Sequence, residues 1–133
     1  NYVAGQWIEG KGAGAALVQQ ATRLAGEGRV GLVEADADTV HDPVARKRLR
    51  FYARLGCRKL EGLDYLLPLR THGLPPPMLL LALAPVNVNS LSVEAVERWL
   101  RLIYIGVYRQ NEDDPRIGQM IGGLGLSVPL TAP

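Results

Sequence analysis

The stretch that decides the fold is RFYARLGC, residues 50–57. Its Gly56 predicts the end of a helix, because glycine adopts the left-handed conformation that stops many helices without a steric penalty. Upstream, Asp42 is a suitable N-cap, and Pro43 stands at the first helical position, where its missing N–H costs nothing. We therefore expect a helix that begins at Pro43 and ends at Leu55.

Upstream of this helix, the run Val30–Ala35 predicts a strand. The run is nearly continuous in apolar residues, which is typical of a strand that is buried on both faces in a parallel arrangement. The acidic segment 36–41 should then form the loop that leads into the helix.

Downstream, two apolar runs predict a further pair of strands. Residues 63–69 and 78–84 flank a loop that contains Gly73 and three consecutive prolines, so we expect a long-looped antiparallel pair. Pro68 favours an edge position or a bulge for the first of them, since proline cannot donate to a sheet ladder.

Beyond Pro85, the pattern predicts one more helix, capped near Ser92. The residues expected on its buried face are Val96, Leu100, Ile103 and Val107. From Asn111 onward the chain is rich in glycine and proline, so we expect a loop or a mobile tail there.

A glycine-rich loop near the start of the chain indicates a ligand. The segment EGKGAG, residues 9–14, opens directly into an apolar-periodic run that predicts a helix over residues 13–26. The first N–H groups of a helix are unpaired and carry a partial positive charge, and glycines leave room for a phosphate to reach them. The spacing fits neither a P-loop nor the dinucleotide fingerprint. A flexible turn before an ordinary helix is the alternative.

Together, the two segments resemble the coenzyme-A-binding half of the GNAT superfamily of N-acyltransferases. In that family a loop of the form Arg/Gln-x-x-Gly-x-Gly/Ala holds the pyrophosphate, and a later helix ends in Tyr-x-x-x-Gly-Phe. Here the loop reads EGKGAG and the helix end reads YARLGC, residues 52–57, in the family's order of loop, helix, strand, helix and strand. The resemblance covers roughly residues 2–84.

The resemblance implies a site. It assigns the pyrophosphate of acetyl-coenzyme A to the backbone amides of Lys11, Gly12, Ala13, Gly14 and Ala15. It also nominates Tyr52 as the acid that protonates the departing thiolate. Proton transfer from a phenol with a pKa of about 10 to a thiolate with a pKa of about 8.5 is uphill by about 2 kcal/mol, a small part of a barrier. The alternative is that Tyr52 is an amphipathic core residue with its hydroxyl at the surface.

Glu34 is the candidate base for the acceptor amine. It shares a strand face with Val30 and Leu32, and partial desolvation there would make it a stronger base. It could instead bind a cationic substrate or pair with an arginine on the next helix. The weaker candidates are Asp36 and Asp38, as loop acids that attract an amine, and His41 and His72, as solvated histidines.

Positive charge is concentrated on the helix expected over residues 43–55. Seven of the fifteen cations fall between Arg46 and Lys59, although the net charge is only +2. They favour a solvated face, with the ribose phosphate of coenzyme A as an alternative ligand. A nucleic-acid surface is disfavoured, because no stacked aromatic pattern accompanies the cations. Cys57 is expected to be a small core residue rather than a nucleophile.

Composition favours one globular unit. With 133 residues, 47% of them hydrophobic and 21% charged, the chain can form a real core. The longest apolar run, residues 78–85, is far shorter than a membrane helix requires. A single cysteine cannot form an internal disulfide, which favours a reducing compartment, and we expect a cytoplasmic protein.

These observations combine into one expectation for the fold. We expect an α/β domain of the mixed α+β kind, with a GNAT-like central mixed sheet flanked by helices. It would lack the N-terminal strands and helices of the family, because only nine residues precede Gly10. Residues 1–85 would form the acetyl-coenzyme-A-binding core, and residues 86–133 a C-terminal helix and mobile tail packed on the same domain. We expect either that upstream residues are absent or that a second copy of the chain completes the sheet as a homodimer.

For function, the resemblance implies an N-acetyltransferase. It would move the acetyl group of acetyl-coenzyme A, its co-substrate, to a primary amine of a small molecule or peptide by direct attack. The alternative is a non-catalytic acyl-coenzyme-A-binding or regulatory module, which Glu9 favours because it stands where the family has Arg or Gln. No metal is expected at the site, and no membrane or nucleic-acid partner.

Overall fold

The computed structural model describes residues 16, 19–20, 23, 29–37, 42–68 and 77–133. The elements follow the chain as β1 (Gly31–Asp36), α2 (Pro43–Arg54), β2 (Cys57–Leu60), β3 (Met78–Leu83), β4 (Ser90–Ser92), α3 (Val93–Leu102), the π-helix η1 (Ile103–Val107), α4 (Pro115–Gly122) and β5 (Ser127–Thr131). The described residues before β1 that are helical are Ala16, Gln19, Gln20 and Arg23, in agreement with the helix predicted over residues 13–26. The fold is mixed α+β, as expected.

Five strands form one sheet in the order β1-β3-β2-β5-β4. Every pairing between the described strands is antiparallel, so the predicted mixed sheet and the parallel setting predicted for β1 are wrong for this part of the chain. β1 pairs with β3 along its whole length, from Gly31 opposite Leu83 to Asp36 opposite Met78. Ala35 is the one buried residue of β1, because β1 lies at the edge of the described sheet.

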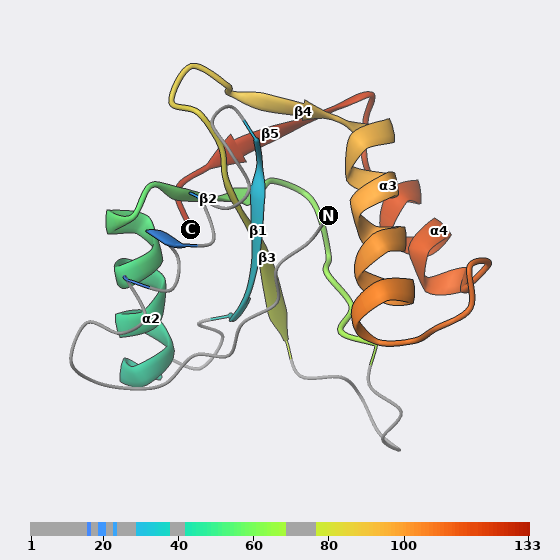
Figure 1. The fold of residues 1–133 in the computed structure, drawn as a ribbon, viewed down its shortest axis with the longest axis horizontal. Coiled ribbons are helices and arrows are strands. Elements are labelled where there is room, and N and C mark those ends of the chain that lie inside the picture. The colour runs from blue at the N-terminus through green and yellow to red at the C-terminus, as the bar shows by residue number, and fades with distance from the viewer. Residues whose placement is uncertain (1–15, 17–18, 21–22, 24–28, 38–41, 69–76) are drawn as a thin grey trace.

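Helices cover both faces of this sheet (Figure 1). α2 lies on one side, and α3 and α4 lie on the other. The buried residues on the α2 side, here called the α2 cluster, are Ala35, Leu49, Tyr52, Cys57 and Leu81. The buried residues on the other side, here called the α3–α4 cluster, are Leu60, Leu63, Tyr65, Leu80, Ala82, Leu91, Val96, Leu100, Tyr104, Ile117, Met120, Val128 and Leu130. Because side chains alternate along a strand, β3 contributes Leu80 and Ala82 to the α3–α4 cluster and Leu81 to the α2 cluster, and the partly buried Leu32 of β1 packs against the α3–α4 cluster.

Helix α2 begins and ends where the sequence predicts, to within one residue. The Asp42 side chain accepts a hydrogen bond from the Val44 N–H at 3.0 Å, and Pro43 is the first helical residue. Gly56 takes φ = +91°, the left-handed conformation expected of a helix stop. Its N–H donates to the Ala53 carbonyl at 3.0 Å, which satisfies one of the last carbonyls of the helix.

The described residues of the segment predicted as a strand over residues 63–69, which are residues 63–68, do not form a strand. The strand that follows α2 is β2, which begins directly after Gly56. The described part of the segment packs into the α3–α4 cluster, where its backbone bonds to side chains instead of a neighbouring strand. The Tyr104 hydroxyl donates to the Leu66 carbonyl, and the Leu66 N–H contacts the Met120 sulfur at 3.3 Å. The other predicted strand of the pair, β3, is confirmed.

Helix α3 also begins as predicted. The Ser92 hydroxyl accepts a hydrogen bond from the Ala95 N–H at 3.2 Å and caps the helix. Val96 and Leu100, two residues of the predicted apolar face, are buried in the α3–α4 cluster. The start of the helix therefore follows from local signals alone.

The end of that helix departs from the prediction. α3 widens into η1, in which the Tyr108 N–H donates to the Ile103 carbonyl at 3.2 Å. A π-turn has more residues than an α-turn, so it changes which residues face the core. Tyr104 is fully buried as a result, whereas Val107, predicted on the apolar face, is 42% exposed.

The expectation of a loop or mobile tail beyond Asn111 is wrong. Helix α4 begins at Pro115 and is capped by Asp114, whose side chain accepts from the Arg116 N–H at 3.0 Å. β5 follows and inserts between β2 and β4. Residues 86–133 thus supply two strands to the same sheet as the described part of residues 1–85.

Candidate functional site

The predicted phosphate loop lies outside the described residues. This applies to Lys11, Gly12, Ala13, Gly14 and Ala15, and equally to Asp38, His41 and His72. The anion-binding role of the loop stays a prediction. The candidate site is built from the two remaining residues of the prediction, Tyr52 and Glu34.

Tyr52 lies near the end of α2, with its ring in the α2 cluster. It is 7% exposed, and its ring meets that of Phe51 edge to face, with 5.3 Å between the ring centres. Burial raises the pKa of Tyr52 above its ordinary value, the neighbouring Cys57 adds to the rise, and Arg48 opposes it. The phenol therefore keeps its proton at neutral pH, which a general acid requires.

An ion pair connects α2 to the end of β1. The Arg48 guanidinium donates to the Asp36 carboxylate at 2.9 Å. Both side chains are at least a third exposed, so the pair adds little stability, but it helps to set where α2 lies along β1. The prediction of Asp36 as a loop acid is wrong, because this residue belongs to β1 and its charge is compensated.

Glu34 lies on β1 and meets a tyrosine from far along the chain. The Tyr108 hydroxyl donates to Glu34 Oε2 at 2.7 Å, across 74 residues. Among the residues that the structure describes, no Lys or Arg forms an ion pair with Glu34. Arg48 of α2 binds Asp36 instead, so the alternative of a pair between Glu34 and an α2 arginine is not realised.

Tyr52 and Glu34 lie on opposite faces of the sheet. Glu34 stands opposite Leu80 in the register, and Leu80 belongs to the α3–α4 cluster. The next residue, Ala35, points to the other face and belongs to the α2 cluster with Tyr52. The structure thus brings the predicted acid and base to the same strand, but to different sides of it.

Three tyrosines that the sequence analysis did not single out gather near Glu34. Tyr65 comes from the extended segment after β2, whereas Tyr104 and Tyr108 come from η1 and its C-terminal end. Burial raises the pKa of all three, that of Tyr104 to about 12, and the negative charge of Glu34 contributes to each rise. The i, i+4 spacing of Tyr104 and Tyr108 indicated a shared helix face, but no local signal connected that face to Glu34.

The three hydroxyls differ in their partners. Tyr108 donates to Glu34, and Tyr104 donates to the Leu66 carbonyl. The Tyr65 hydroxyl is buried and makes no hydrogen bond. The Glu34 carboxylate is near enough to raise the pKa of Tyr65 through its charge and through a weak side-chain interaction with the hydroxyl, but the two groups do not form a hydrogen bond of ordinary geometry. One hydroxyl of the group is therefore unused.

The backbone that presents Tyr108 is unusual at two points. η1 is a π-helix, and such turns occur frequently at functional sites. The residue after Tyr108, Arg109, takes φ = +56°, a left-handed conformation that costs a non-glycine residue about 1–2 kcal/mol. Gln110 closes the turn, since its N–H donates to the Tyr104 carbonyl at 2.9 Å.

A cation lies next to the tyrosines but is already paired. The Arg116 guanidinium carbon is 5.3 Å from the centre of the Tyr104 ring. The same guanidinium donates to the Asp114 carboxylate at 2.8 Å. Arg116 therefore supports Tyr104 by packing and a cation–π contact, and its ion pair is with Asp114 rather than with Glu34.

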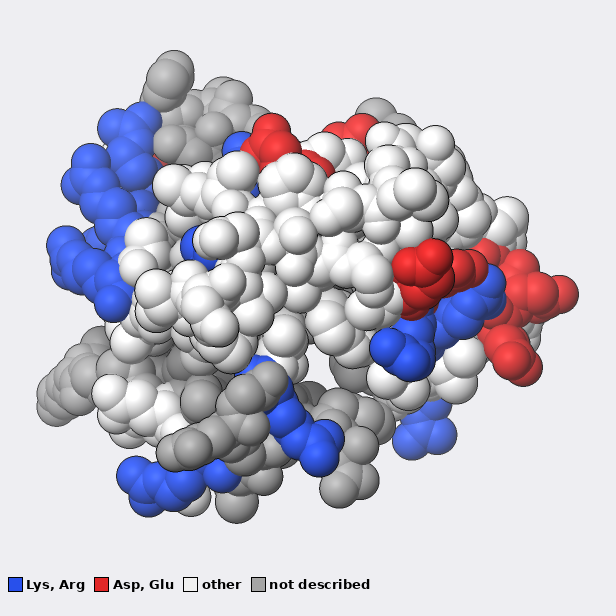
Figure 2. Space-filling model, turned by 90° about the horizontal axis from the view of Figure 1, so that it is seen from above, with Lys and Arg blue, Asp and Glu red and all other residues white. Residues whose placement is uncertain are grey.

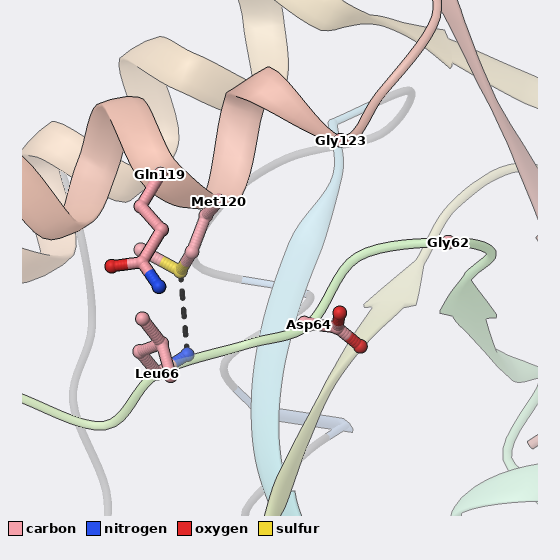
Figure 3. Close-up of a pocket in the computed structure, with 6 residues that line it drawn as sticks. All are labelled: Gly62, Asp64, Leu66, Gln119, Met120 and Gly123. Atoms are coloured by element: carbon pink, nitrogen blue, oxygen red, sulfur yellow. Dashed lines mark hydrogen bonds between the residues drawn. The ribbon is translucent and has the colours of Figure 1, made fainter.

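A separate cavity of about 100 Å³ lies between the start of the extended segment and α4. The residues that line it are Gly62, Asp64, Leu66, Gln119, Met120 and Gly123. Figure 3 shows the Asp64 carboxylate pointing away from Gln119 and Met120, so the polar groups do not converge. Ligand pockets usually measure about 300–1,000 Å³, and this cavity does not qualify as a coenzyme site.

A basic surface covers the outer side of α2. Lys47, Arg50 and Arg54 are exposed and follow one another at helical spacing, and α2 contains no acidic residue. Figure 2 shows basic side chains gathered along the edge on which α2 lies. The arrangement agrees with the predicted solvated face, and the ribose-phosphate alternative stays a prediction.

Cys57 is a core residue, as predicted. It is 1% exposed, and burial raises the pKa of its thiol to about 11, so it is not a thiolate nucleophile at neutral pH. Within the described residues, no group of three potential metal ligands occurs. None of the helices in this part of the chain is long and apolar enough to cross a membrane.

Comparisons with known proteins found nothing similar to this chain. A scan of family models, a search of curated proteins and a search of solved structures each returned no match. A functional proposal therefore rests on the residues of the site and on the motif resemblance.

Proposed function

We propose that this protein is a GNAT-type N-acetyltransferase, which transfers the acetyl group of acetyl-coenzyme A to a primary amine. The observation that carries the proposal is the end of α2, where Tyr52 precedes a Gly56 with φ = +91°. The described elements also follow the order of the motif resemblance, with helical residues before β1, then α2 and β2. This order supports the assignment of residues 11–15 to the pyrophosphate.

In this proposal Tyr52 gives a proton to the leaving thiolate. Its raised pKa keeps the phenol protonated until the carbon–sulfur bond breaks. Each pKa unit of mismatch between phenol and thiol adds about 1.4 kcal/mol to the proton transfer. A modest rise is therefore compatible with catalysis, because the thiolate forms only in the transition state.

Glu34 acts as the base in the same proposal. The acceptor arrives as an ammonium ion and gives one proton to the Glu34 carboxylate. The neutral amine attacks the thioester carbon, so that a carbon–nitrogen bond forms as the carbon–sulfur bond breaks. The nitrogen loses its second proton to water, and the Tyr52 phenolate on the other side of the sheet regains its proton from water. One proton, carried by Glu34, is released to solvent.

The opposite faces of β1 suit this division of roles. A thioester lying at the edge of β1 would meet the amine and Glu34 on the α3–α4 side. Its sulfur would be directed toward the side of α2 and Tyr52. In this proposal the amine attacks on one face of the sheet and the thiolate leaves on the other, because Glu34 and Tyr52 lie on those two faces.

Acetyl-coenzyme A should raise the Tm of the protein, and thiol release should appear when primary amines are added. Lack of a Tm rise at saturating acetyl-coenzyme A would refute the proposal. Tm stabilisation without thiol release from any primary amine would instead favour the alternative of a non-catalytic acyl-coenzyme-A-binding module. The substitution of Glu9 for the usual Arg or Gln is the feature that favours this alternative.

Tyr52→Phe tests the acid. We expect kcat to fall about a hundredfold, the usual contribution of general acid catalysis, with acetyl-coenzyme A affinity nearly unchanged. Tyr104→Phe is the matched control, because it also removes a buried tyrosine hydroxyl, one that donates to a backbone carbonyl. Unaltered turnover in Tyr52→Phe would remove Tyr52 from the chemistry.

A further inference from the structure

The unused hydroxyl of Tyr65 calls for a partner. Tyr65 is 4% exposed, and its hydroxyl oxygen is buried without a hydrogen bond. A buried polar group that has lost its hydration and gained no partner destabilises the fold, so most such groups in proteins are satisfied. A hydroxyl kept in this state indicates a ligand that completes its hydrogen bonding.

Glu34 offers the other half of a binding site. Tyr108 donates to Oε2, but a neutral hydroxyl does not cancel the charge of a carboxylate. In the described part of the chain, Arg48 is paired with Asp36 and Arg116 with Asp114. Within the described residues, the charge of Glu34 therefore has no cationic partner.

We propose that Glu34, Tyr65 and Tyr108 form a binding site for a primary ammonium group, the acceptor of the proposed acetyl transfer. An ammonium has three N–H donors, of which the Glu34 carboxylate accepts at least one and the Tyr65 oxygen another. Tyr108 is a positioning residue, because it holds one carboxylate oxygen and leaves the other for the ligand. The inference rests on the proposed function for the identity of the cation as an acceptor amine.

The donor set favours an ammonium over a metal ion. Calcium and magnesium require about six or more oxygen ligands, several of them charged, whereas this site has one carboxylate and neutral phenols. No group of three His, Cys, Asp or Glu side chains occurs among the residues described. Aromatic rings next to a carboxylate attract an organic cation through their electron-rich faces as well. The predicted ligand class is thus a primary alkylammonium.

The first experiment is a titration with n-propylammonium, followed by NMR of tyrosine ring signals in the full chain. We expect saturable shifts of the Tyr65 and Tyr108 signals, assigned from their Phe variants, and no saturable shift with n-propanol. Glu34→Gln should weaken binding at least about tenfold, since it removes the charge and nearly preserves the shape. Absence of a saturable shift in the wild-type protein, as expected if only water fills the site, would overturn the proposal.

Tyr65→Phe separates a binding role from a structural one. Because the hydroxyl has no partner in the fold, its removal should leave the Tm unchanged or higher, while n-propylammonium binds several-fold more weakly. Tyr104→Phe should behave in the opposite way, with a lower Tm and unchanged ammonium affinity, because its hydroxyl bonds to Leu66. Wild-type ammonium affinity in Tyr65→Phe would overturn the proposal.

Kinetics distinguish this inference from the proposed reaction. Tyr65→Phe and Tyr108→Phe should raise the KM for the amine and leave the KM for acetyl-coenzyme A unchanged. Acetyl transfer with unchanged amine KM in both variants would refute the ammonium site and retain the reaction. Ammonium binding by a protein that shows no response to acetyl-coenzyme A would retain the site and refute the reaction.

Discussion

The tyrosines on the two faces of the sheet lie in different surroundings. On the α2 face, Tyr52 packs among apolar side chains and beside the thiol of Cys57. On the α3–α4 face, three tyrosines gather near the charge of Glu34, and one of their hydroxyls is left without a partner. The first face thus retains one protonated phenol in an apolar setting. The second places the half-buried carboxylate of Glu34 beside three tyrosines, of which Tyr65 and Tyr104 belong to the larger core.

The helix ends on the two faces differ in backbone strain. α2 stops at Gly56, whose left-handed conformation carries no steric penalty. The turn after η1 uses Arg109 in a left-handed conformation, next to the tyrosine that binds Glu34. Backbone strain therefore lies on the side that holds the carboxylate, as is common near functional sites.

The largest effect should come from the core of the second face. Leu100 is fully buried in the α3–α4 cluster, and Leu100→Ala should lower the free energy of unfolding by about 3 kcal/mol, measured by urea denaturation. Leu49→Ala is the matched change in the α2 cluster, where the side chain is 8% exposed and the cluster is smaller. We expect a loss of about 2 kcal/mol there. Equal or reversed losses would show that the α3–α4 face does not dominate stability.

The next effect concerns the end of α2. Gly56→Ala should lower the free energy of unfolding by about 1–2 kcal/mol, because alanine is strained at φ = +91°. An added Cβ would lie 3.7 Å from Leu83, so the loss would come from the backbone rather than from a clash. Gly123→Ala is the control, since its φ is −86° and no atom lies within 4 Å. A similar loss of stability at both positions would contradict the claim that the left-handed conformation at Gly56 requires glycine.

The sequence predicts the helix caps and the helix stop correctly, but it does not predict the surroundings of Glu34. The caps at Asp42 and Ser92 and the stop at Gly56 are interactions between residues within a few positions of one another, so the local sequence contains them. The tyrosines around Glu34 are not local to it, because Tyr108 lies 74 residues away and Tyr65 belongs to a segment that was predicted as a strand. Single-sequence patterns carry no information on such contacts.

The C-terminal elements were missed for a different reason. The Asp114-Pro115 start of α4 repeats the signal at Asp42-Pro43, but glycines around it lower the local helix propensity. α4 is stabilised instead by burial of Ile117 and Met120 against the α3–α4 cluster. Tertiary packing overrode propensity here, which also explains why β5 was predicted as part of a loop.

The two Asp-Pro helix starts predict different acid sensitivity. Burial of Asp114 opposes ionisation, but its hydrogen bond from the Arg116 side chain is the larger influence and lowers the pKa of Asp114 below its ordinary value. A lowered pKa in the folded state contributes stability above the ordinary aspartate pKa, and this is lost as pH falls through the folded-state value. The Tm should therefore fall between pH 5 and pH 2.5, at about the pH window in which aspartates titrate.

Asparagine substitutions isolate this contribution, because asparagine preserves an N-cap and does not titrate. In Asp114→Asn the Tm at pH 7 should be lower than in the wild type, and its decrease toward pH 2.5 should be smaller. Asp42→Asn, at the start of α2, is the comparison, since Asp42 accepts from the Val44 N–H and forms no ion pair with an arginine among the described residues. An identical acid response of the wild type and Asp114→Asn would contradict a role for the Asp114–Arg116 pair.

The smallest effect should be a gain at Arg109. Its side chain is exposed, and Arg109→Gly removes the steric strain at φ = +56° while adding backbone freedom to the unfolded chain. The two effects partly cancel, so we expect a gain of about 0.5 kcal/mol in the free energy of unfolding. Arg109→Ala keeps the strain while it removes the charge, and its free energy of unfolding should be nearly unchanged.

If Tyr108 is positioned by this strained turn, Arg109→Gly should raise the amine KM although it stabilises the fold. A gain in stability with an unchanged amine KM would mean that η1 and its bond to Glu34 hold Tyr108 without help from Arg109.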